Sequence, residues 1–562
     1  MSSRRRGVGD GSGKRGSAGR RAPTMRFSLG GEQAEADPLL RDSFFDTAQY
    51  EALSSRDDPK CFIIGRTGSG KSAMLKQIEE EHRGHVIRIT PDDLSLPYVA
   101  GLGAIKHLVE NEVHLSPFFI ALWKHIFLVE IIRHRYSVNS PTAKQNFLSS
   151  LRDRVAQDRS KLAAIEYLND FGDRFWCETD ERVREITEKF EEQVKAQGAV
   201  GVSQLGLSAG VETTGVRTLE HRTELVDRYQ KIVNDTQLPR LNKMIAVLDE
   251  DILDSAQNFT WIIIDDLDRD WVDDQIANDL ILCLFRAVVD MKRVENLKIL
   301  VALRANIFVA LDFAGRNGGQ EEKFRALTMR LRWTPTDMHG MLDQRVSVAA
   351  RRAGLSDLDG VNDILPPKNP KRGDALQFIL RRTMMRPRDA IAYLNTCHEL
   401  SAGRPRISWE HLNDAEPRYS HNRLLALRDE WKASFPGLDT VLGTFTGAPT
   451  VLSPEKFRAH LDDVAMLLAN SEFAGRDWLM DLTKPVWEGK GEQDRGLDPF
   501  RPLIELLYSI GFIGLRQATP KAVFSQDQPE FFSQHHAFSS IASFVVHPAF
   551  WATLGIGRRD DV

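Results

Sequence analysis

The chain has 562 residues, of which 42% are hydrophobic and 27% are charged. This length exceeds what one hydrophobic core supports, so roughly two to four domains are expected, and the composition excludes a wholly disordered, collagen-like or disulfide-scaffold protein. The net charge of −5 is unevenly distributed, because residues 1–21 carry seven basic side chains and a single acid. The rest of the chain is therefore distinctly acidic.

Residues 1–38 are predicted to form a flexible basic tail, because their first part is rich in glycine, serine and arginine. A leader without a specific role is favoured, and a tail that contacts nucleic acid or a membrane surface is the alternative. The basic residues are not followed by the apolar segment of a secretory signal, so export is not expected.

The four cysteines stand singly, which favours a reduced, cytoplasmic protein over a disulfide-bonded one. The most apolar stretch, residues 117–132, is interrupted by Lys124, His125 and Glu130. Because a membrane span needs about 20 nearly uninterrupted apolar residues, this stretch is predicted to be a buried helix, and no membrane partner is expected.

A phosphate-binding motif follows the apolar residues 61–64, where the sequence GRTGSGKS matches G-x-x-x-x-G-K-[ST]. In this Walker A pattern the glycines let backbone N–H groups surround phosphates, the lysine reaches the β- and γ-phosphates, and the last hydroxyl binds Mg²⁺. Apolar spacing predicts a helix directly afterwards, and an ordinary glycine turn is the alternative. The predicted ATP-binding residues are Gly65, Arg66, Thr67, Gly68, Ser69, Gly70, Lys71 and Ser72, with Ser72 also a metal ligand.

A second motif supplies carboxylates, because the apolar run at 261–264 ends in Asp265, Asp266 and Asp268. Such a run is typical of a parallel strand buried on both faces, and ligands bind at the carboxyl ends of these strands. Asp265 is predicted to bind Mg²⁺ and Asp266 to act as general base, since adjacent side chains point in opposite directions. Asp268 is the rival base, and a purely structural acidic turn is the alternative.

A third predicted strand, residues 297–303, ends at Arg304. If it lies parallel to the others, Arg304 joins Lys71 and Asp266 in catalysis by stabilising the γ-phosphate, and a surface arginine is the alternative. The chain between the two motifs is too long for a compact core. A mostly helical insertion is therefore predicted at 103–255, with a small hairpin at 202–216, between core segments 39–102 and 256–333. The insertion is expected to bind a partner, or else to shield the sheet.

These motifs resemble bacterial P-loop ATPases of the KAP and STAND types, which are related to AAA+ proteins. The resemblance rests on GRTGSGKS, WIIIDDLDR, VALR at 301–304 and MRPRD at 385–389, with further similarity in ITPDDLS at 89–95, YSHNR at 419–423 and DEW at 429–431. It implies nucleotide-driven switches, often oligomeric, some of which act against phage. It also implies that Arg386 and Arg388 point from a lid to the nucleotide phosphates, although solvated surface arginines are the alternative.

The remaining chain is predicted to form a helical lid at 334–404 and a C-terminal domain at 405–562. Thr334, Pro335 and Asp337 form a helix start, and Gly354 marks the stop. Further on, a helix at 501–510, a glycine and two short strands are typical of a winged helix. Because residues 503–510 contain no basic side chain, contact with protein is favoured over DNA reading.

The sequence thus predicts an α/β fold: a P-loop NTPase parallel sheet with a large helical insertion, a helical lid and a C-terminal winged-helix-like α/β module. The predicted activity is Mg²⁺-dependent ATP hydrolysis that drives a switch or assembly platform for a protein partner, an effector or a second copy of the chain. A homo-oligomer is expected, and nucleic acid is not favoured as a partner. The alternatives are a DNA-binding initiator-like or loader-like ATPase, or a scaffold that hydrolyses ATP very slowly.

Overall fold

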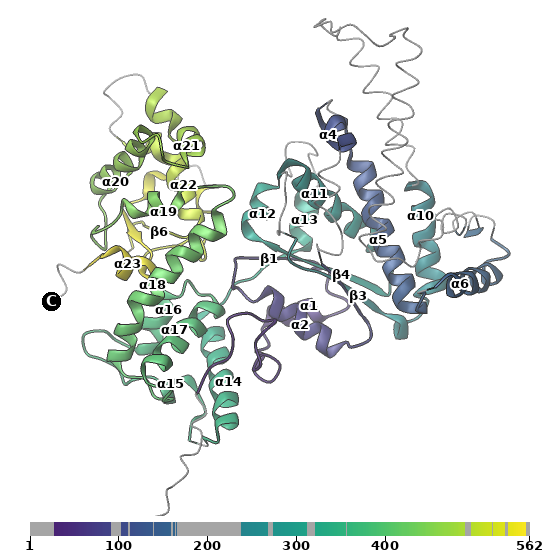
Figure 1. Ribbon diagram of the computed structural model, residues 1–562, viewed down its shortest axis with the longest axis horizontal. Helices are drawn as coiled ribbons and strands as arrows, with labels where there is room; N and C mark the ends of the chain where they lie inside the picture. The colour runs from purple at the N-terminus through teal and green to yellow at the C-terminus, as the bar shows by residue number, and fades with distance from the viewer. Residues whose placement is uncertain are drawn as a thin grey trace, which may run out of the picture.

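A computed structural model gives the arrangement of most of the chain (Figure 1). It describes residues 27–90, 103–110, 113–138, 140–158, 161–162, 165, 238–267, 274–311, 321–355, 357–488, 496–519, 521–533 and 538–557. The predicted hairpin at 202–216 and the rival base Asp268 lie outside these residues. Among the described helices, none has the length and apolar character that crossing a membrane requires.

A five-stranded parallel sheet forms the core, with the order β2-β3-β4-β1-β5. The strands are β1 (Phe62–Gly65), β2 (Val86–Ile89), β3 (Thr260–Ile264), β4 (Leu297–Arg304) and β5 (Thr328–Arg330). Strand β4 lies between the strand that leads into the phosphate loop and the strand that leads into the acids. The predicted parallel α/β core is therefore confirmed, and its motif-bearing strands all end at one edge.

Helices cover both faces of this sheet, so its apolar side chains are buried on either side. One face packs Ile63, Ile263 and Leu300 against α1 (Ala48–Ser54) and α2 (Lys71–Glu81). The other packs Phe62, Ile262 and Val301 in a core shared with the long buried helix α5. The helices on that side are α4 (Gly103–Glu110), α5 (Ser116–Tyr136), α6 (Pro141–Arg154), α10 (Leu238–Val247), α11 (Asp274–Met291), α12 (Ala305–Ala310) and α13 (Glu321–Leu327). Alternate strand residues thus supply two separate cores.

The described part of the insertion packs on the sheet face rather than standing apart from it. Helix α5 is the predicted buried helix, and its Trp123 Nε1 donates a hydrogen bond to the Leu280 carbonyl of α11 at 2.9 Å. Phe62 of β1 stacks on Phe285 of α11 with ring centroids 3.8 Å apart. The described part of the insertion therefore covers the sheet, and partner binding by the insertion stays a prediction.

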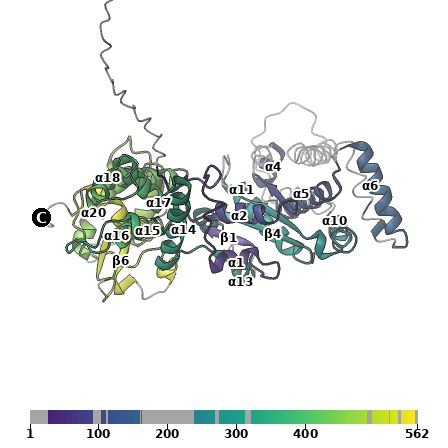
Figure 2. The ribbon, with the colours of Figure 1, turned by 90° about the horizontal axis from the view of Figure 1, so that it is seen from below.

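The helical lid begins at the predicted capping box, where the Asp337 N–H donates to Thr334 Oγ1 and the Thr334 N–H donates to Asp337 Oδ2, both at 3.1 Å. Its helices are α14 (Pro335–Ala353), α15 (Val361–Ile364), α16 (Ala375–Arg382), α17 (Pro387–Leu400) and α18 (Trp409–Trp431). Helix α18 contributes Tyr419 to the lid core and Leu427 to the C-terminal core. It therefore belongs to both units, and the two lie together at one end of the molecule (Figure 2).

The C-terminal module combines helices with a two-stranded antiparallel sheet. Its elements are α19 (Leu438–Gly443), α20 (Pro454–Met466), α21 (Arg476–Glu488), α22 (Arg501–Ser509), β6 (Ile513–Arg516), β7 (Ser543–Val546) and α23 (Trp551–Leu554). Its single-turn helices are Leu467–Ala469, Asp498–Phe500, Phe531–Ser533, Phe538–Ser540 and Pro548–Phe550, and two others, Leu248–Ile252 and Ala256–Asn258, precede β3 in the core. The helix, glycine turn and two strands lie where the sequence placed them, and a winged-helix assignment stays a prediction.

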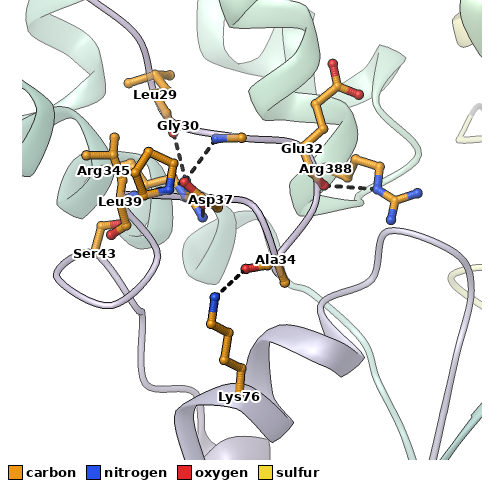
Figure 3. Close-up of polar contacts among 12 residues, drawn as sticks. Leu29, Gly30, Glu32, Ala34, Asp37, Leu39, Ser43, Lys76, Arg345 and Arg388 are labelled. Atoms are coloured by element: carbon orange, nitrogen blue, oxygen red, sulfur yellow. Dashed lines mark hydrogen bonds and ion pairs between the residues drawn. The ribbon is translucent and has the colours of Figure 1, made fainter. Parts of the chain in front are cut away.

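Residues 27–42 form an ordered segment, here called the N-terminal strap, that crosses the lid and the P-loop side of the core (Figure 3). Phe27 and Leu29 are buried in the lid core. Asp37 pairs with Arg345 of α14 at 2.8 Å and accepts the N–H groups of Gly31 and Leu39, each at 3.0 Å. The prediction of a flexible tail is therefore wrong for residues 27–38, because a few apolar residues and one buried ion pair fix them.

Replacing Asp37 with Asn should destabilise the fold strongly. The amide oxygen can still accept the two backbone N–H groups, but Arg345 loses its counter-charge, and a broken buried ion pair costs about 3–5 kcal/mol. The free energy of unfolding in urea measures this loss. The matched control is Asp42→Asn, which breaks an exposed pair with Arg352 and should leave unfolding nearly unchanged. Equal effects of the two substitutions would contradict an anchoring role for Asp37.

Candidate functional site

The GRTGSGKS sequence forms a strand–loop–helix turn at the sheet edge, as the sequence predicts. Strand β1 ends at Gly65, and α2 begins at Lys71 after Gly70, whose φ is 99°. Gly68 has a φ of 79°. These left-handed conformations strain any residue with a Cβ atom, so the glycines are required for the loop to place the N-terminus of α2 beside the cavity.

Lys71 and Trp333 both contact the backbone of this loop. Lys71 Nζ donates to the carbonyls of Gly65 at 2.9 Å and Arg66 at 3.2 Å. Trp333 Nε1 donates to the Ser69 carbonyl at 2.8 Å, so the residue directly before the lid braces the loop. The sequence carries no local signal for this tryptophan contact, because the two residues are far apart along the chain.

The two acids follow β3 directly and differ in their surroundings. Asp265 is 3% exposed, and its Oδ1 accepts the Asp266 N–H at 2.9 Å. Its buried Oδ2 makes no hydrogen bond of normal geometry among the described residues, and Arg88 Nη2 lies 3.8 Å away. Burial and the charge of Asp266 raise the pKa of Asp265, against the lowering effect of the Ser72 hydroxyl. Because Oδ2 is buried and has no partner at hydrogen-bonding geometry among the described residues, it fits a cation ligand.

Asp266 has a φ of 57°, which is an uncommon conformation for a residue other than glycine. Such strain is often retained at functional sites. It turns the chain immediately after Asp265, so the two neighbouring carboxylates share one cavity.

One cavity brings together most of the residues that the sequence selected. The parallel register places Arg304 of β4 opposite Gly65 of β1, so the cation lies beside the loop and at the same edge as Asp265. The lining residues from the core and the lid include Thr67, Gly68, Gly70, Lys71, Ser72, Asp265, Asp266, Arg304, Arg345 and Arg388. The opposite wall comes from the strap, through Gly31, Glu32, Ala34, Glu35, Asp37 and Leu40. The sequence did not predict this second wall.

The two lid arginines differ in position. Arg388 lines the cavity, and its Nε donates to the Glu32 carbonyl of the strap at 3.2 Å (Figure 3). Arg386 is 8% exposed and does not line this cavity but a neighbouring pocket, where its Nη1 donates to the Thr67 carbonyl at 3.2 Å. The expectation that both arginines point to phosphates is therefore wrong for Arg386, because a buried carboxylate, Glu430 of α18, pairs with it at 3.4 Å.

Arg66 and Glu430 contribute to the rear of the loop in ways that the sequence did not reveal. The Arg66 side chain turns away from the cavity, and its Nη2 donates to the Ile510 carbonyl. Glu430 accepts the Thr67 N–H at 3.4 Å. Burial alone would raise the pKa of Glu430, but the charges of Arg386 and Arg66 outweigh it and lower the pKa. Glu430 is therefore held as a carboxylate.

Comparison with known proteins finds similarities of three kinds. Residues 336–428 match the FunZ-associated C-terminal helical domain, so the match includes most of α18 and extends beyond the domain boundary predicted at 404. A protein of Escherichia coli (strain K12) named for transposon gamma-delta is 21% identical over 544 residues, covering 94% of this chain and 67% of that protein. The Aeropyrum pernix ORC1 protein, solved in complex with DNA, aligns over 93% of this chain and 95% of its own, with 12% identity and a TM-score of 0.30. These matches do not carry the KAP or STAND names.

The contact between the loop and the lid can be tested at Gly68. A Cβ atom there would lie 2.9 Å from the Cβ of Arg388, in addition to the strain of the left-handed backbone. Gly354 has a φ of 72°, and a Cβ atom added there would meet no atom within 4 Å, so Gly354→Ala isolates the backbone strain, about 1–2 kcal/mol. Gly68→Ala should cost about 1–3 kcal/mol more because of overpacking. Urea unfolding measures both, and equal costs would show that Arg388 does not press on the loop.

Proposed function

We propose that this chain binds ATP with Mg²⁺ at the loop of residues 65–72 and hydrolyses it. The observation that supports this best is the shared cavity, in which the Walker A loop faces the acids after β3 and the arginine after β4. The strap wall carries Glu32 and Glu35, so the anionic phosphates are expected at the opposite wall, near Lys71 and Arg304. The nucleoside then lies toward the strap and α17.

Each residue near the phosphates has a distinct role in this proposal. Ser72 and Asp265 hold Mg²⁺, and the buried Asp265 Oδ2 without a hydrogen bond is the feature that fits an ion. When bound, Mg²⁺ neutralises charge on the phosphate oxygens. Lys71, Arg304 and Arg388 add positive charge where the transferred group develops negative charge, and Asp266 orients and deprotonates the attacking water.

We further propose that nucleotide turnover drives a switch or assembly platform for a protein partner, which is an effector or a second copy of the chain. The continuous helix α18 supports a switch, because it joins the lid beside the cavity to the C-terminal module. The resemblance to KAP and STAND ATPases would place this activity in bacterial defence against phage. The identity of neighbouring genes tests that setting, since a nuclease or toxic effector beside this gene is the expected finding.

Lys71→Ala should abolish the rise in melting temperature that ATP and Mg²⁺ give the wild type. A ligand at 100 times its dissociation constant stabilises a protein by about 2.7 kcal/mol, and the loss of the phosphate-binding cation removes most of that affinity. A thermal melt with and without nucleotide measures the effect. Lys368→Ala, which changes an exposed lysine on the lid, should retain the full shift. A normal shift in Lys71→Ala would place the nucleotide elsewhere.

Asp266→Asn separates an enzyme from an ATP-binding scaffold. Removing a general base should lower the single-turnover hydrolysis rate by about 10²–10⁴-fold while leaving nucleotide binding largely intact. Rapid-quench measurements with enzyme in excess over ATP give this rate directly. Asp254→Asn, at an exposed aspartate before β3, is the control with the same change of charge. If the wild type and Asp266→Asn hydrolyse ATP equally slowly, the chain is a scaffold.

A further inference from the structure

A group of charged side chains packs against the loop outside the main cavity, beside a neighbouring pocket that is lined by Arg386, Glu430 and Thr67. It consists of Arg66, Arg386 and Glu430, here called the P-loop clamp. The three come from the loop itself, the residue that caps α17, and the second half of α18. The Arg386 side chain is 9% exposed and that of Glu430 is 6% exposed, so little solvent screens their interaction.

The clamp holds both polar backbone groups of one loop residue. Glu430 Oε1 accepts the Thr67 N–H at 3.4 Å, and Arg386 Nη1 donates to the Thr67 carbonyl at 3.2 Å. The same Arg386 Nη1 lies 3.4 Å from Glu430 Oε2. The orientation of the peptide groups on either side of Thr67, directly before Gly68, is therefore set by side chains from the lid and α18.

Arg66 extends the clamp to the C-terminal module. Its Nη2 donates to the carbonyl of Ile510, which caps the C-terminal end of α22, where the helix dipole favours a cation. Gly511 follows with a φ of 79°, and a Cβ there would lie 2.4 Å from Arg66 Nη1. Burial and the neighbouring Arg386 lower the pKa of Arg66 to about 9, and Glu430 opposes that shift. Glu430 therefore pairs with Arg386, and its charge also favours the charged form of Arg66.

The lid segment that carries Arg386 is strained. Met384 and Met385 precede it with φ values of 48° and 51°, which are uncommon for residues with side chains. Two consecutive left-handed residues persist only where the surroundings fix them, and such strain is concentrated at functional sites. Met384 also lies near Gly511, where a Cβ would come within 2.9 Å of the methionine Cε. The strained turn thus lies between the loop and the C-terminal module.

We propose that Glu430 is a positioning residue for the nucleotide reaction: through Thr67 and Arg386 it fixes the loop in its phosphate-binding shape. This inference rests on the proposed nucleotide site. The direction of its effect follows from preorganisation, because a loop that is already ordered loses less conformational entropy when it binds phosphates. Removing Glu430 should therefore weaken nucleotide binding even though the residue does not line the main cavity.

Nucleotide affinity in Glu430 variants tests this proposal. Glu430→Ala should bind ADP·Mg²⁺ and a non-hydrolysable ATP analogue at least about 10-fold more weakly than the wild type, within the usual range of coupling between sites. Glu430→Gln should weaken binding less, because its amide oxygen still accepts the Thr67 N–H. Asp429→Asn is the matched control, since it changes an exposed carboxylate on the preceding residue of α18, and it should stay within about 2-fold of the wild type. Isothermal titration calorimetry gives the affinity of each of the four proteins for each ligand.

Amide hydrogen exchange without nucleotide provides the second measurement. Exchange in residues 65–72 should be at least about 5-fold faster in Glu430→Ala than in Asp429→Asn, because the loop loses its fixed orientation. If Glu430→Ala does not fold, Glu430→Gln replaces it in both measurements. Unchanged affinity together with unchanged exchange in a folded variant overturns the proposal. If the wild type binds no nucleotide, the proposed function fails, and the exchange measurement still decides whether Glu430 positions the loop.

Discussion

The phosphate loop is packed on both sides, and the rest of the structure is arranged around that constraint. Its cavity side faces the acids after β3 and Arg304 after β4, because β4 lies between the strands that carry the two motifs. Its rear contacts the lid and the C-terminal module through Arg386 and Arg66. Glycine is required at two close approaches of an arginine side chain: Arg388 lies against Gly68, and Arg66 lies against Gly511. The loop thus joins the sheet to everything that follows it in the chain.

The charged side chains are also arranged around the phosphate loop. The described body of the protein surrounds the loop with arginines that each have a specific partner: a strap carbonyl for Arg388, a carboxylate for Arg386 and a helix end for Arg66. Arg345 is neutralised by Asp37 and so fixes the strap instead of adding free positive charge to the cavity. A buried guanidinium without a partner would be costly, which explains why the buried Arg345 and Arg386 each face a carboxylate.

The sequence predicted those features that depend on local patterns. Apolar strand runs, the glycine spacing of residues 65–72 and the capping box at Thr334 each act within a few residues, and the structure places all of them as expected. The strap, the Arg386–Glu430 pair and the Trp333 contact depend on partners tens to hundreds of residues away. The spacing of apolar residues along the chain does not indicate such a distant partner. Glycine and serine also dominate the first residues, so composition concealed the apolar anchors Phe27 and Leu29.

Helix α18 connects the P-loop clamp to the C-terminal module. Its first half packs in the lid core, its second half packs in the C-terminal core, and Glu430 lies near its end. A shift of the C-terminal module therefore moves Glu430 and the Ile510 carbonyl together, and both contact the loop. Coupling between two binding events is reciprocal. If a ligand of the module changes the affinity for nucleotide by some factor, nucleotide must change the affinity of the module for that ligand by the same factor. A ligand that shifted the C-terminal module would therefore change the nucleotide affinity of the proposed site without touching the cavity.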